Sequence, residues 1–336
     1  MIKKIIDIKN LKTQNNGLFS EAVKNFFYIQ LEKWDLLKQN IQNLKEVKTK
    51  EFNFGLYDII AQFNPARIKS TTAAVDKDSI ENRKCFLCLD NLPAEQIALP
   101  YEKNYLILCN PYPIFPEHFT IVRTRHKPQT IVGAFGDLLN LTKDLSKYFV
   151  VFYNGPQCGA SAPDHMHFQA ATNGIMPLEK NYYQIKQELS TCIFKNDKLE
   201  IYCVEKYPAK FFLFESDSKG ELLYAFKIFF NNYRKISSSK PEPMFNILSK
   251  FEKEKWHVFI FPRLKHRPTY YFEKNENNFA ISPAAVDLSG LLIVPRENDF
   301  NRLTSQIVLD VYKQVTLTTE YFEYLKKKLK EVFAAK

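Results

Sequence analysis

The stretch N-G-P-Q-C-G-A-S-A-P-D-H-M-H-F-Q, residues 154–169, sets a turn of small residues directly before an H-x-H-x-Q segment. If this segment is a β-strand, alternation puts His165, His167 and Gln169 on one face of the sheet. The small-residue turn ahead of it frees backbone N–H groups to hold an anion. Two imidazoles, an amide and a phosphate-binding turn together indicate transfer of a nucleotidyl group through a covalent histidine intermediate.

Each part of this stretch has a chemical role in such a transfer. A nucleophilic imidazole at His167 can attack an α-phosphorus and form a phosphoramidate, which a second acceptor then resolves. Gln169 can donate a hydrogen bond to phosphate oxygens without taking up a proton. The backbone N–H groups of Gly159, Ala160 and Ser161, with the Ser161 hydroxyl, can stabilise developing charge. The alternative is an ordinary strand with two half-buried histidines, which the glycine turn disfavours.

Four residues have the types and spacing of a closed zinc site. Cys85 and Cys88 form a C-x-x-C motif, which lets two thiolates reach one tetrahedral metal from a tight turn. The expected ligands are Cys85, Cys88, His126 and His165, with His118 as the competing fourth ligand. The alternative is two buried cysteines with unrelated histidines. Because four protein ligands leave no open position, the zinc would be structural and would fix the strand that carries the H-x-H-x-Q segment.

The composition is that of a globular protein with a large, aromatic-rich core. The chain has 336 residues, of which 45% are hydrophobic and 15% aromatic. These values exclude a disordered or collagen-like chain and allow one large domain or two closely packed ones. The six cysteines fit a reducing cytosol. Residues 1–7 lack the apolar run of a secretory signal, and no stretch reaches the roughly 18 apolar residues of a membrane span, so we expect a cytoplasmic protein with no membrane partner.

The formal net charge of +10 has two interpretations. It reflects either a basic surface that aids solubility or attraction toward polyanionic substrates such as nucleotides. The absence of a long Lys/Arg tract argues against a nucleic-acid partner. Arg67 is the strongest phosphate-binding candidate because it precedes the C-x-x-C motif and an Arg fork matches phosphate oxygens. A second basic group is expected to be mostly a solvated face: Arg263, Lys265, His266 and Arg267.

Apolar periodicity and turn residues predict a mixture of helices and strands. In the first half we expect helices over 20–47 and 131–146, and strands over 52–63, 105–109, 118–123, 149–153 and 165–170. In the second half, 245–248 and 257–266 repeat the pattern of 105–108 and 118–126, which indicates an internal duplication. A strand over 290–294 and a terminal helix over 302–329 would complete the second copy. The clearest linker is a Ser- and Pro-containing loop at 237–243.

These motifs together resemble the branch of the histidine-triad superfamily that holds the galactose-1-phosphate uridylyltransferases, the diadenosine tetraphosphate phosphorylases and the GDP-hexose phosphorylases. Arg67 followed by C-F-L-C at 85–88 is similar to the uridylyltransferase zinc motif after its phosphate-binding arginine. Residues 154–161 are similar to the phosphate loop of the dinucleotide phosphorylases. H-M-H-F-Q-A at 165–170 and I-S-P-A-A-V-D-L-S-G at 281–290 are most similar to the GDP-hexose phosphorylases.

The resemblance, which runs from about residue 50 to about residue 325, implies an α+β fold of duplicated histidine-triad-like halves around a mainly antiparallel sheet. An N-terminal helical segment would span 1–50, a first half with the active site 51–190, and a degenerate second half 191–336. His167 would be the nucleophile, and Gln169 would replace the third histidine of the triad, a change that marks transferases and phosphorylases rather than hydrolases. The substrate-binding residues would be Arg67, Asn154, Gly159, Ala160 and Ser161.

The function expected is that of a nucleotidyltransferase or phosphorylase that passes an NMP group to inorganic phosphate or to a sugar phosphate. GDP-hexose is the leading substrate, a dinucleoside polyphosphate such as diadenosine tetraphosphate is the second, and UDP-hexose with galactose 1-phosphate is the third. The alternatives from other classes are a hydrolase and a nucleotide- or RNA-binding module on the same scaffold. Because a duplicated architecture can complete the site within one chain, both a monomer and a homodimer fit the sequence.

Overall fold

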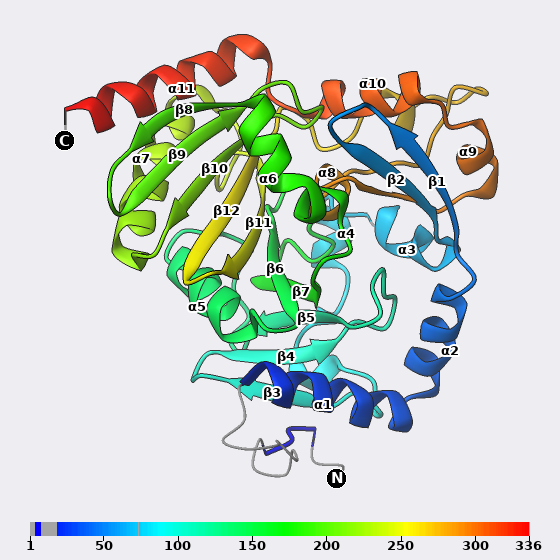
Figure 1. Cartoon of the computed structure of the whole chain (residues 1–336). Helices are drawn as coiled ribbons and strands as arrows, with labels where there is room; N and C mark the ends of the chain where they lie inside the picture. The colour runs from blue at the N-terminus through cyan, green and yellow to red at the C-terminus, as the bar shows by residue number, and fades with distance from the viewer. Residues whose placement is uncertain (1–3, 8–18, 73, 336) are drawn as a thin grey trace.

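One large sheet organises the molecule, and all of its strands pair antiparallel (Figure 1). The computed structural model describes residues 4–7, 19–72 and 74–335. The strands of the large sheet are β3 (Ala98–Tyr101), β4 (Tyr105–Cys109), β5 (His118–Arg123), β6 (Phe149–Asn154), β7 (His167–Thr172), β8 (Ser190–Lys195), β9 (Leu199–Val204), β10 (Phe211–Ser216), β11 (Phe245–Glu252) and β12 (Lys255–Pro262). Their spatial order is β3-β4-β5-β7-β6-β11-β12-β10-β9-β8. Together with the helices, this sheet confirms the α+β fold class.

The large sheet is built from two copies of one unit, so the internal duplication is present in the fold. The first unit is β3, β4, β5, α5 (Phe135–Leu145), β6 and β7, and the second is β8, β9, β10, α7 (Lys219–Ile236), β11 and β12. The units meet where β6 pairs with β11, from Asn154↔Asn246 to Val151↔Ser249. The predicted alignment of the copies is wrong, because 245–262 forms β11 and β12, which occupy the places of β6 and β7 rather than of β4 and β5.

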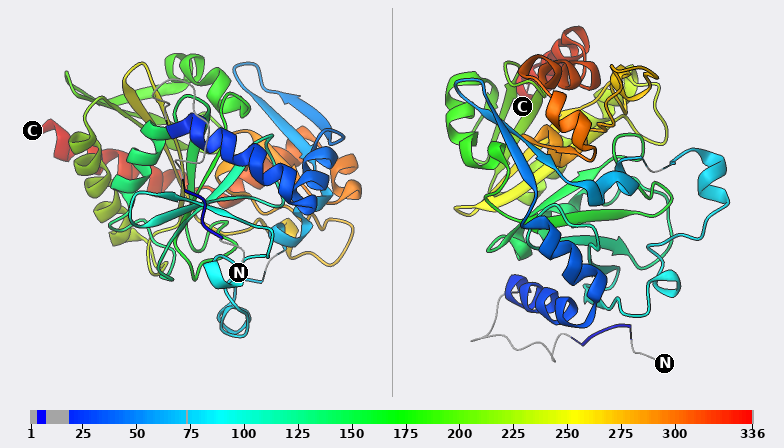
Figure 2. Two further views of the ribbon diagram at one scale, coloured as in Figure 1. Left: turned by 90° about the horizontal axis from the view of Figure 1, so that it is seen from below. Right: turned by 90° about the vertical axis from the view of Figure 1, so that its right-hand side faces the viewer.

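A second, smaller sheet stands beside the large one (Figure 2) and holds β1 (Lys48–Asn53), β2 (Asp58–Phe63) and β13 (Leu291–Val294). The single strand predicted over 52–63 is a hairpin, because the chain turns at Gly55, where φ is +84°. β13 pairs parallel with β2, from Leu291↔Ile60 onward. The strand predicted over 290–294 therefore exists but joins this small sheet, and it does not complete the second copy.

Two hydrophobic cores lie on opposite faces of the large sheet. The first packs against α1 (Phe19–Lys33), α5, α7 and α11 (Thr319–Ala334), and the second against α6 (Pro177–Leu189), α8 (Ala285–Leu288), α10 (Ser305–Val315) and the small sheet. The other α-helices among the described residues are α2 (Asp35–Leu44), α3 (Ile68–Thr71), α4 (Lys77–Glu81) and α9 (Glu297–Arg302). Phe168 and Ala170 of β7 belong to the first core and Ala171 to the second, so His167 and Gln169 share the face of the second core.

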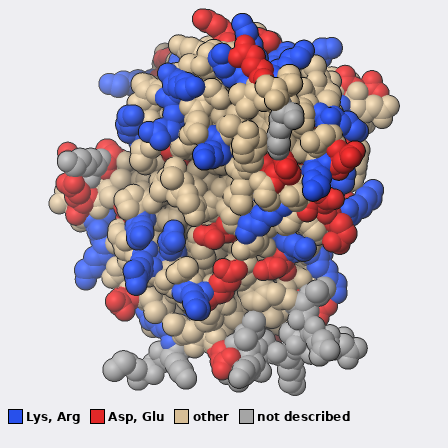
Figure 3. Space-filling view, turned by 90° about the vertical axis from the view of Figure 1, so that its left-hand side faces the viewer, with Lys and Arg blue, Asp and Glu red and all other residues tan. Residues whose placement is uncertain are grey.

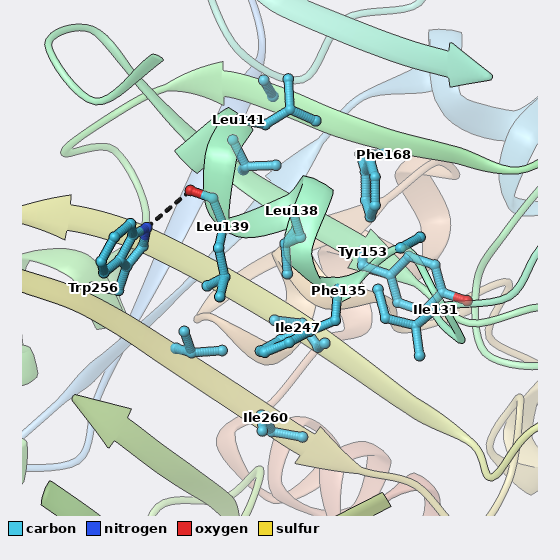
Figure 4. Packing of buried hydrophobic residues seen from close by; sticks show 14 of the residues in the cluster. Ile131, Phe135, Leu138, Leu139, Leu141, Tyr153, Phe168, Ile247, Trp256 and Ile260 are labelled. Atoms are coloured by element: carbon cyan, nitrogen blue, oxygen red, sulfur yellow. Dashed lines mark hydrogen bonds between the residues drawn. The ribbon is translucent and has the colours of Figure 1, made fainter. Parts of the chain in front are cut away.

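The first core shows how the two units hold each other (Figure 4). Phe135 of α5 stacks on Phe226 of α7, with ring centroids 3.9 Å apart and planes at 11°. The Nε1–H of Trp256 on β12 donates to the carbonyl oxygen of Leu139 at 2.9 Å, which ties α5 to the second unit. α5 begins later than predicted because Gly133 has φ +77° and breaks the helical path.

Two of the predicted helices are interrupted. The helix expected over 20–47 is α1 and α2, because the backbone of the buried Trp34 between them is extended, with φ −133° and ψ 98°. The helix expected over 302–329 is instead divided among α9, α10 and α11. Thr304 and Thr318 cap α10 and α11, each hydroxyl accepting a bond from a backbone N–H three residues later. Each cap satisfies an orphan donor and allows a new helix to start.

The loop at 237–243 is anchored by a buried carboxylate. Glu242, which is 1% exposed, accepts hydrogen bonds from the Tyr153 hydroxyl at 2.6 Å, the Thr130 hydroxyl at 3.0 Å and the Ile131 N–H at 2.9 Å. Burial raises the pKa of Glu242 to about 6, although these three bonds to the carboxylate oppose the rise. The expected linker is therefore fastened to the turn before α5 and to β6.

We expect the contribution of Glu242 to the unfolding free energy to decrease as the pH rises. Its folded-state pKa of about 6 lies above its ordinary value of 4.5, so the stability it contributes is complete below pH 4.5 and is lost as the pH rises past 6. The difference corresponds to about 2 kcal/mol of unfolding free energy. Tyr153 and Cys158 also face Glu242, and both have raised pKa values that keep them neutral in this window.

Urea unfolding at several pH values between 4 and 7 measures this effect. The unfolding free energy of the Glu242→Gln variant should depend less on pH than that of the unaltered protein. Equal pH dependence in the two proteins would contradict the assignment.

The surface carries the excess of basic residues without gathering them into one patch on the face that Figure 3 presents. Lys and Arg side chains are spread over this face with Asp and Glu among them (Figure 3). Among the residues that the structure describes, no helix is both long and apolar enough to span a bilayer.

Candidate active site

A cavity of about 420 Å³ lies on the face of the large sheet that carries the second core. The catalytic and substrate-binding residues expected from the sequence all line it: Arg67, Asn154, Gly159, Ala160, Ser161, His167 and Gln169. The second half of the chain contributes further lining residues: His266, Arg267, Ser282, Ala284 and Asp287. Apolar side chains line another part of the wall: Trp34, Phe86, Leu87, Leu92 and Leu108. The volume is in the range of small-molecule sites, and both halves of one chain contribute to it.

His167, the first residue of β7, is held by its backbone and by its ring. Its N–H donates to Gln129 Oε1 at 2.8 Å, and its carbonyl oxygen accepts from Gln129 Nε2 at 3.0 Å. The ring Nδ1 lies 2.7 Å from the carbonyl oxygen of His165, so Nδ1 carries the hydrogen and Nε2 keeps its lone pair. Burial lowers the pKa of His167 to about 4, which leaves the ring neutral near pH 7. A neutral imidazole with a basic Nε2 in a cavity has the form that a nucleophile requires.

Gln169, two residues along the same strand, is oriented by His118 on β5. His118 Nδ1 accepts a hydrogen bond from the Ile114 N–H at 3.3 Å, so Nε2–H donates to Gln169 Oε1 at 2.9 Å. Burial and the nearby charge of Arg67 lower the pKa of His118 to about 3, which keeps this ring neutral. With its oxygen bound to His118, Gln169, which lines the cavity, has its NH₂ group as the donor available to a substrate. His118 thus orients an amide, and it lies outside the group of candidate metal ligands.

The glycine turn is shaped by close contact with the second half of the chain. Gly159 has φ +109°, and a Cβ at this position would lie 2.5 Å from the Cβ of Ala284. Both the conformation and the space therefore require glycine. Ala160 and Ser161 follow directly and line the cavity. The turn approaches the segment before α8 so closely that the two form one continuous wall.

Arg67 and Asp287 bring opposite charges into the cavity from the two halves of the chain. Arg67 Nη1 donates to the carbonyl oxygen of Tyr112 at 2.8 Å, and burial lowers its pKa to about 10, so it remains protonated near pH 7. The buried Asp287 accepts hydrogen bonds from the N–H groups of Ala284 and Ile293, each at 2.8 Å. Burial raises the pKa of Asp287 to about 6, against the effect of these bonds and of Arg67.

Asn154 and one member of the predicted basic face connect the halves. Asn154 Oδ1 accepts from Asn246 Nδ2 at 2.8 Å and from the Ala285 N–H at 2.9 Å, so its own amide NH₂ is the group left to reach a substrate. Arg263, expected among solvated residues, is 2% exposed and donates to Asn246 Oδ1 and to the carbonyl oxygen of Pro283. For Arg263 the expected solvated face is wrong, because its guanidinium satisfies buried acceptors.

The four predicted metal ligands lie together in one cluster. Within the described part of the chain, the donor atoms of Cys85, Cys88, His126 and His165 are all within 4.8 Å of one another. His165 Nδ1 is 3.3 Å from Cys85 Sγ, and His126 Nδ1 is 3.2 Å from Cys88 Sγ. Two sulfurs and two imidazole nitrogens at this spacing can hold one metal ion, and the donor set is the one that zinc prefers.

The surroundings of the cluster also fit a metal. His165 Nε2–H donates to the carbonyl oxygen of Arg123 at 2.7 Å, so Nδ1 presents a lone pair to the thiols. Asp164, beside it, pairs with Arg83 and lies 3.9 Å from His126 Nε2. The strand predicted from residue 165 begins at His167 instead, because residues 162–165 form a hydrogen-bonded turn. That turn lets His165 face the cluster while His167 faces the cavity.

The second half carries a histidine at the matching register. His257 on β12 pairs with Glu215, the fifth residue of β10, as His167 on β7 pairs with Val122, the fifth residue of β5. His257 Nδ1 lies 2.7 Å from Glu215 Oε1 and is buried. Two residues further along β12 stands Phe259 in place of a glutamine, so this half keeps a histidine without the neighbouring amide.

Three residues around the cavity were missed by sequence reasoning or given another role. No motif marks Gln129 in the sequence. It follows His126 in a basic stretch, and its side chain contacts the backbone of His167 rather than another side chain of the site. His118 opens an apolar strand, and the sequence predicts for it only the role of a competing metal ligand. Asp287 is an acidic residue within an apolar run, which is the signal that the sequence offers for it.

Two family models cover most of the chain. Residues 26–172 match the domain of unknown function DUF4922, and residues 183–336 match the model described as GDPGP1-like, C-terminal domain. No curated protein matches the chain.

Several solved structures are similar to this chain, and the two with a TM-score above 0.5 share its fold. The yeast Ap4A phosphorylase Apa2 has a TM-score of 0.54 at 17% identity, over 84% of this chain and 97% of that one. Apa2 in complex with Ap4A has a TM-score of 0.52 at 18% identity, over 84% and 97% of the two chains. A uridylyltransferase mutant has a TM-score of 0.41 at 14% identity, over 74% and 94%. Residues 183–336 thus match a GDPGP1-like C-terminal domain, and the chain as a whole shares the fold of the yeast Ap4A phosphorylase Apa2.

Proposed function

We propose that this protein is a nucleotidyltransferase of the phosphorylase type, which transfers an NMP group through a covalent intermediate on His167. The observation that carries the proposal is the state of the His167 ring. Nδ1–H is bound to the carbonyl oxygen of His165, and Nε2 keeps its lone pair in a cavity that Gln169 and the glycine turn also line. A binding module has no need for a neutral imidazole oriented in this way.

In the first half-reaction, the Nε2 lone pair of His167 attacks the α-phosphorus of the bound nucleotide. An N–P bond forms, and the bond from the α-phosphorus to the bridging oxygen breaks. The electron pair of that bond leaves with the departing phosphate ester, which for a nucleoside-diphosphate hexose is hexose 1-phosphate. The Nδ1–H···O bond to His165 stabilises the positive charge that develops on the ring.

In the second half-reaction, an oxygen of inorganic phosphate or of a sugar phosphate attacks the phosphoramidate. The N–P bond breaks and its electron pair returns to His167 Nε2, so the ring is restored without an external proton donor. Gln169, whose oxygen accepts from His118, directs its NH₂ donors at the phosphoryl oxygens in both steps. An amide at this position cannot serve as an acid or base toward water, which favours transfer over hydrolysis.

A GDP-hexose is the substrate that we favour. The match of residues 183–336 to the GDPGP1-like C-terminal domain supports it, as does the similarity of 281–290 to GDP-hexose phosphorylases. The fold of the yeast Ap4A phosphorylase favours a dinucleoside polyphosphate as the second candidate. The catalytic roles of His167 and Gln169 are the same for both substrates. Arg67, Asn154 and the turn from Gly159 to Ser161 would bind the phosphates.

A zinc ion bound by Cys85, Cys88, His126 and His165 would be structural in this proposal. All four positions of a tetrahedral ion would be filled by protein, so its contribution is to fix the turn before β7. We further propose that the enzyme works in the cytoplasm, as a monomer or homodimer, without nucleic acid or membrane as partner.

Intact-protein mass spectrometry after brief mixing with substrate tests the function directly. The protein is mixed with GDP-glucose, UDP-glucose or diadenosine tetraphosphate, each without phosphate. We expect a mass gain of one GMP from GDP-glucose, and added phosphate should remove the adduct and yield GDP. Release of free NMP without phosphate would indicate a hydrolase. Nucleotide binding with no adduct from any of the three would favour the binding module.

A further inference from the structure

We propose that Gln129 is the residue that positions His167 for attack on the α-phosphorus. The inference rests on the proposed function, because it concerns the geometry of the same nucleophile. Gln129 lies between β5 and α5 and is completely buried, and it does not line the cavity. It is therefore a positioning residue that acts through the backbone of His167.

Gln129 fills a gap where two central strands separate. The pairing of β6 with β7 runs from Phe149↔Thr172 to Phe152↔Gln169 and ends there. Beyond this point Gln129 Nε2 donates to the carbonyl oxygens of Asn154, at 2.9 Å, and of His167, at 3.0 Å. Its Oε1 accepts from the His167 N–H at 2.8 Å. One amide therefore replaces the missing rungs of the ladder and satisfies three buried backbone groups.

These bonds fix the direction in which the His167 ring leaves the strand. The side-chain amide of Gln129 binds both the N–H and the carbonyl oxygen of His167. The peptide planes on either side of the His167 Cα therefore cannot rotate. The backbone N–H of Gln129 donates to the carbonyl oxygen of Pro163 at 2.9 Å. This bond anchors Gln129 to the turn before β7. The ring bond to the carbonyl oxygen of His165 then sets the tautomer.

The same amide also ties the nucleophile to the groups that hold the phosphate. Asn154 begins the glycine turn, and its carbonyl oxygen shares Gln129 Nε2 with that of His167. The distance from the phosphate-binding turn to the attacking nitrogen is thus set by one side chain. Reacting atoms must approach within about 3–3.5 Å in a productive complex, and a misplacement of about 1 Å can lower the rate by about 100-fold.

Gln30 provides a matched control because its side-chain amide also binds backbone groups of a distant segment, away from His167. It is also completely buried, its Nε2 donates to the carbonyl oxygen of Glu95 at 2.9 Å, and its Oε1 accepts from the Ile97 N–H at 2.7 Å. It joins α1 to the chain before β3 and does not line the cavity. Replacing either glutamine strands buried backbone groups and should destabilise the fold, but only Gln129 touches His167.

The test compares Gln129→Met, Gln129→Glu and Gln30→Met in the full chain. The single-turnover rate of adduct formation is measured with saturating GDP-glucose, UDP-glucose or diadenosine tetraphosphate, together with the dissociation constant and the melting temperature. We expect Gln129→Met to lower the adduct rate by roughly 100-fold while the dissociation constant changes by less than about threefold. Gln30→Met should lose comparable thermal stability yet keep the adduct rate within about threefold. Gln129→Glu keeps an acceptor for the His167 N–H but repels two carbonyls, so a reduced rate is expected there too.

Three results would overturn the inference in distinguishable ways. Adduct rates near normal in folded Gln129→Met or Gln129→Glu would remove the positioning role and leave the proposed function standing. An equal loss of rate in Gln30→Met would show that general destabilisation explains the effect. No adduct in the unaltered protein with any of the three nucleotides would overturn the proposed function, and the positioning role with it. If Gln129→Met does not fold, the rate of Gln129→Glu decides.

Discussion

Replacing His167 with glycine is expected to abolish the covalent adduct and to lower turnover by at least about 10⁴-fold. The proposed reaction has no other route to a phosphoramidate at this position, and removal of a nucleophile commonly costs a factor of this size or more. Nucleotide binding should survive, because Arg67, Asn154 and the glycine turn do not depend on the ring. The measurements are steady-state turnover, adduct mass and the dissociation constant of the nucleotide.

The fold should tolerate the His167→Gly substitution. The backbone of His167 stays bound to Gln129, and the lost ring lines a cavity that already exists. Only a modest loss of stability is therefore expected, and circular dichroism with thermal unfolding checks it.

His257→Gly is the matched control, since this histidine occupies the same register in the second unit and is also buried. Removing the His257 ring takes one partner from Glu215, but Glu215 keeps its ion pair with Lys186. Adduct formation should persist in this variant. Turnover that is undiminished in His167→Gly, or lost equally in both variants, would exclude His167 as the nucleophile.

The candidate site residues that the structure brings together are mostly those whose chemistry shows in a local motif. The C-x-x-C spacing and the H-x-H-x-Q alternation specify which side chains can share a metal or a face, whatever the rest of the fold does. The structure accordingly brings the four candidate ligands to one place and the seven candidate catalytic and binding residues to one cavity. Within each motif the chemistry is readable because the spacing alone sets which side chains can act together.

The residues that sequence reasoning did not place depend on contacts between distant segments. Gln129 acts on His167 across 38 positions, and His118 orients Gln169 across 51 positions. No periodicity or spacing encodes such a pair. The predicted helix ends differ from the observed ones for a similar reason, because the extended backbone of the buried Trp34 overrides a favourable apolar pattern. The alignment of the duplicated copies was wrong because strands of similar composition cannot be told apart without their pairing partners.

The double substitution Cys85→Ser with Cys88→Ser is expected to remove the metal and to lower thermal stability strongly. As purified, the unaltered protein should carry about one zinc per chain, and the variant should carry none. A ligand present at about 1,000 times its dissociation constant stabilises a fold by about 4 kcal/mol, so the melting temperature of a chain of this length should fall by roughly 6 °C. Elemental analysis and thermal unfolding measure the two effects.

The double substitution Cys192→Ser with Cys203→Ser is the control. It removes two thiols that lie outside the candidate metal cluster, so any effect common to losing two cysteines would appear here as well. Cys192 and Cys203 lie on the adjacent strands β8 and β9, far in sequence from the cluster, and one is exposed and the other buried. Their replacement should leave the zinc content unchanged and cost only local packing. Zinc content that is unaffected by the substitutions at Cys85 and Cys88 would rule out the cluster as its site. Zinc lost without a fall in melting temperature would show that the ion does not stabilise the turn before β7.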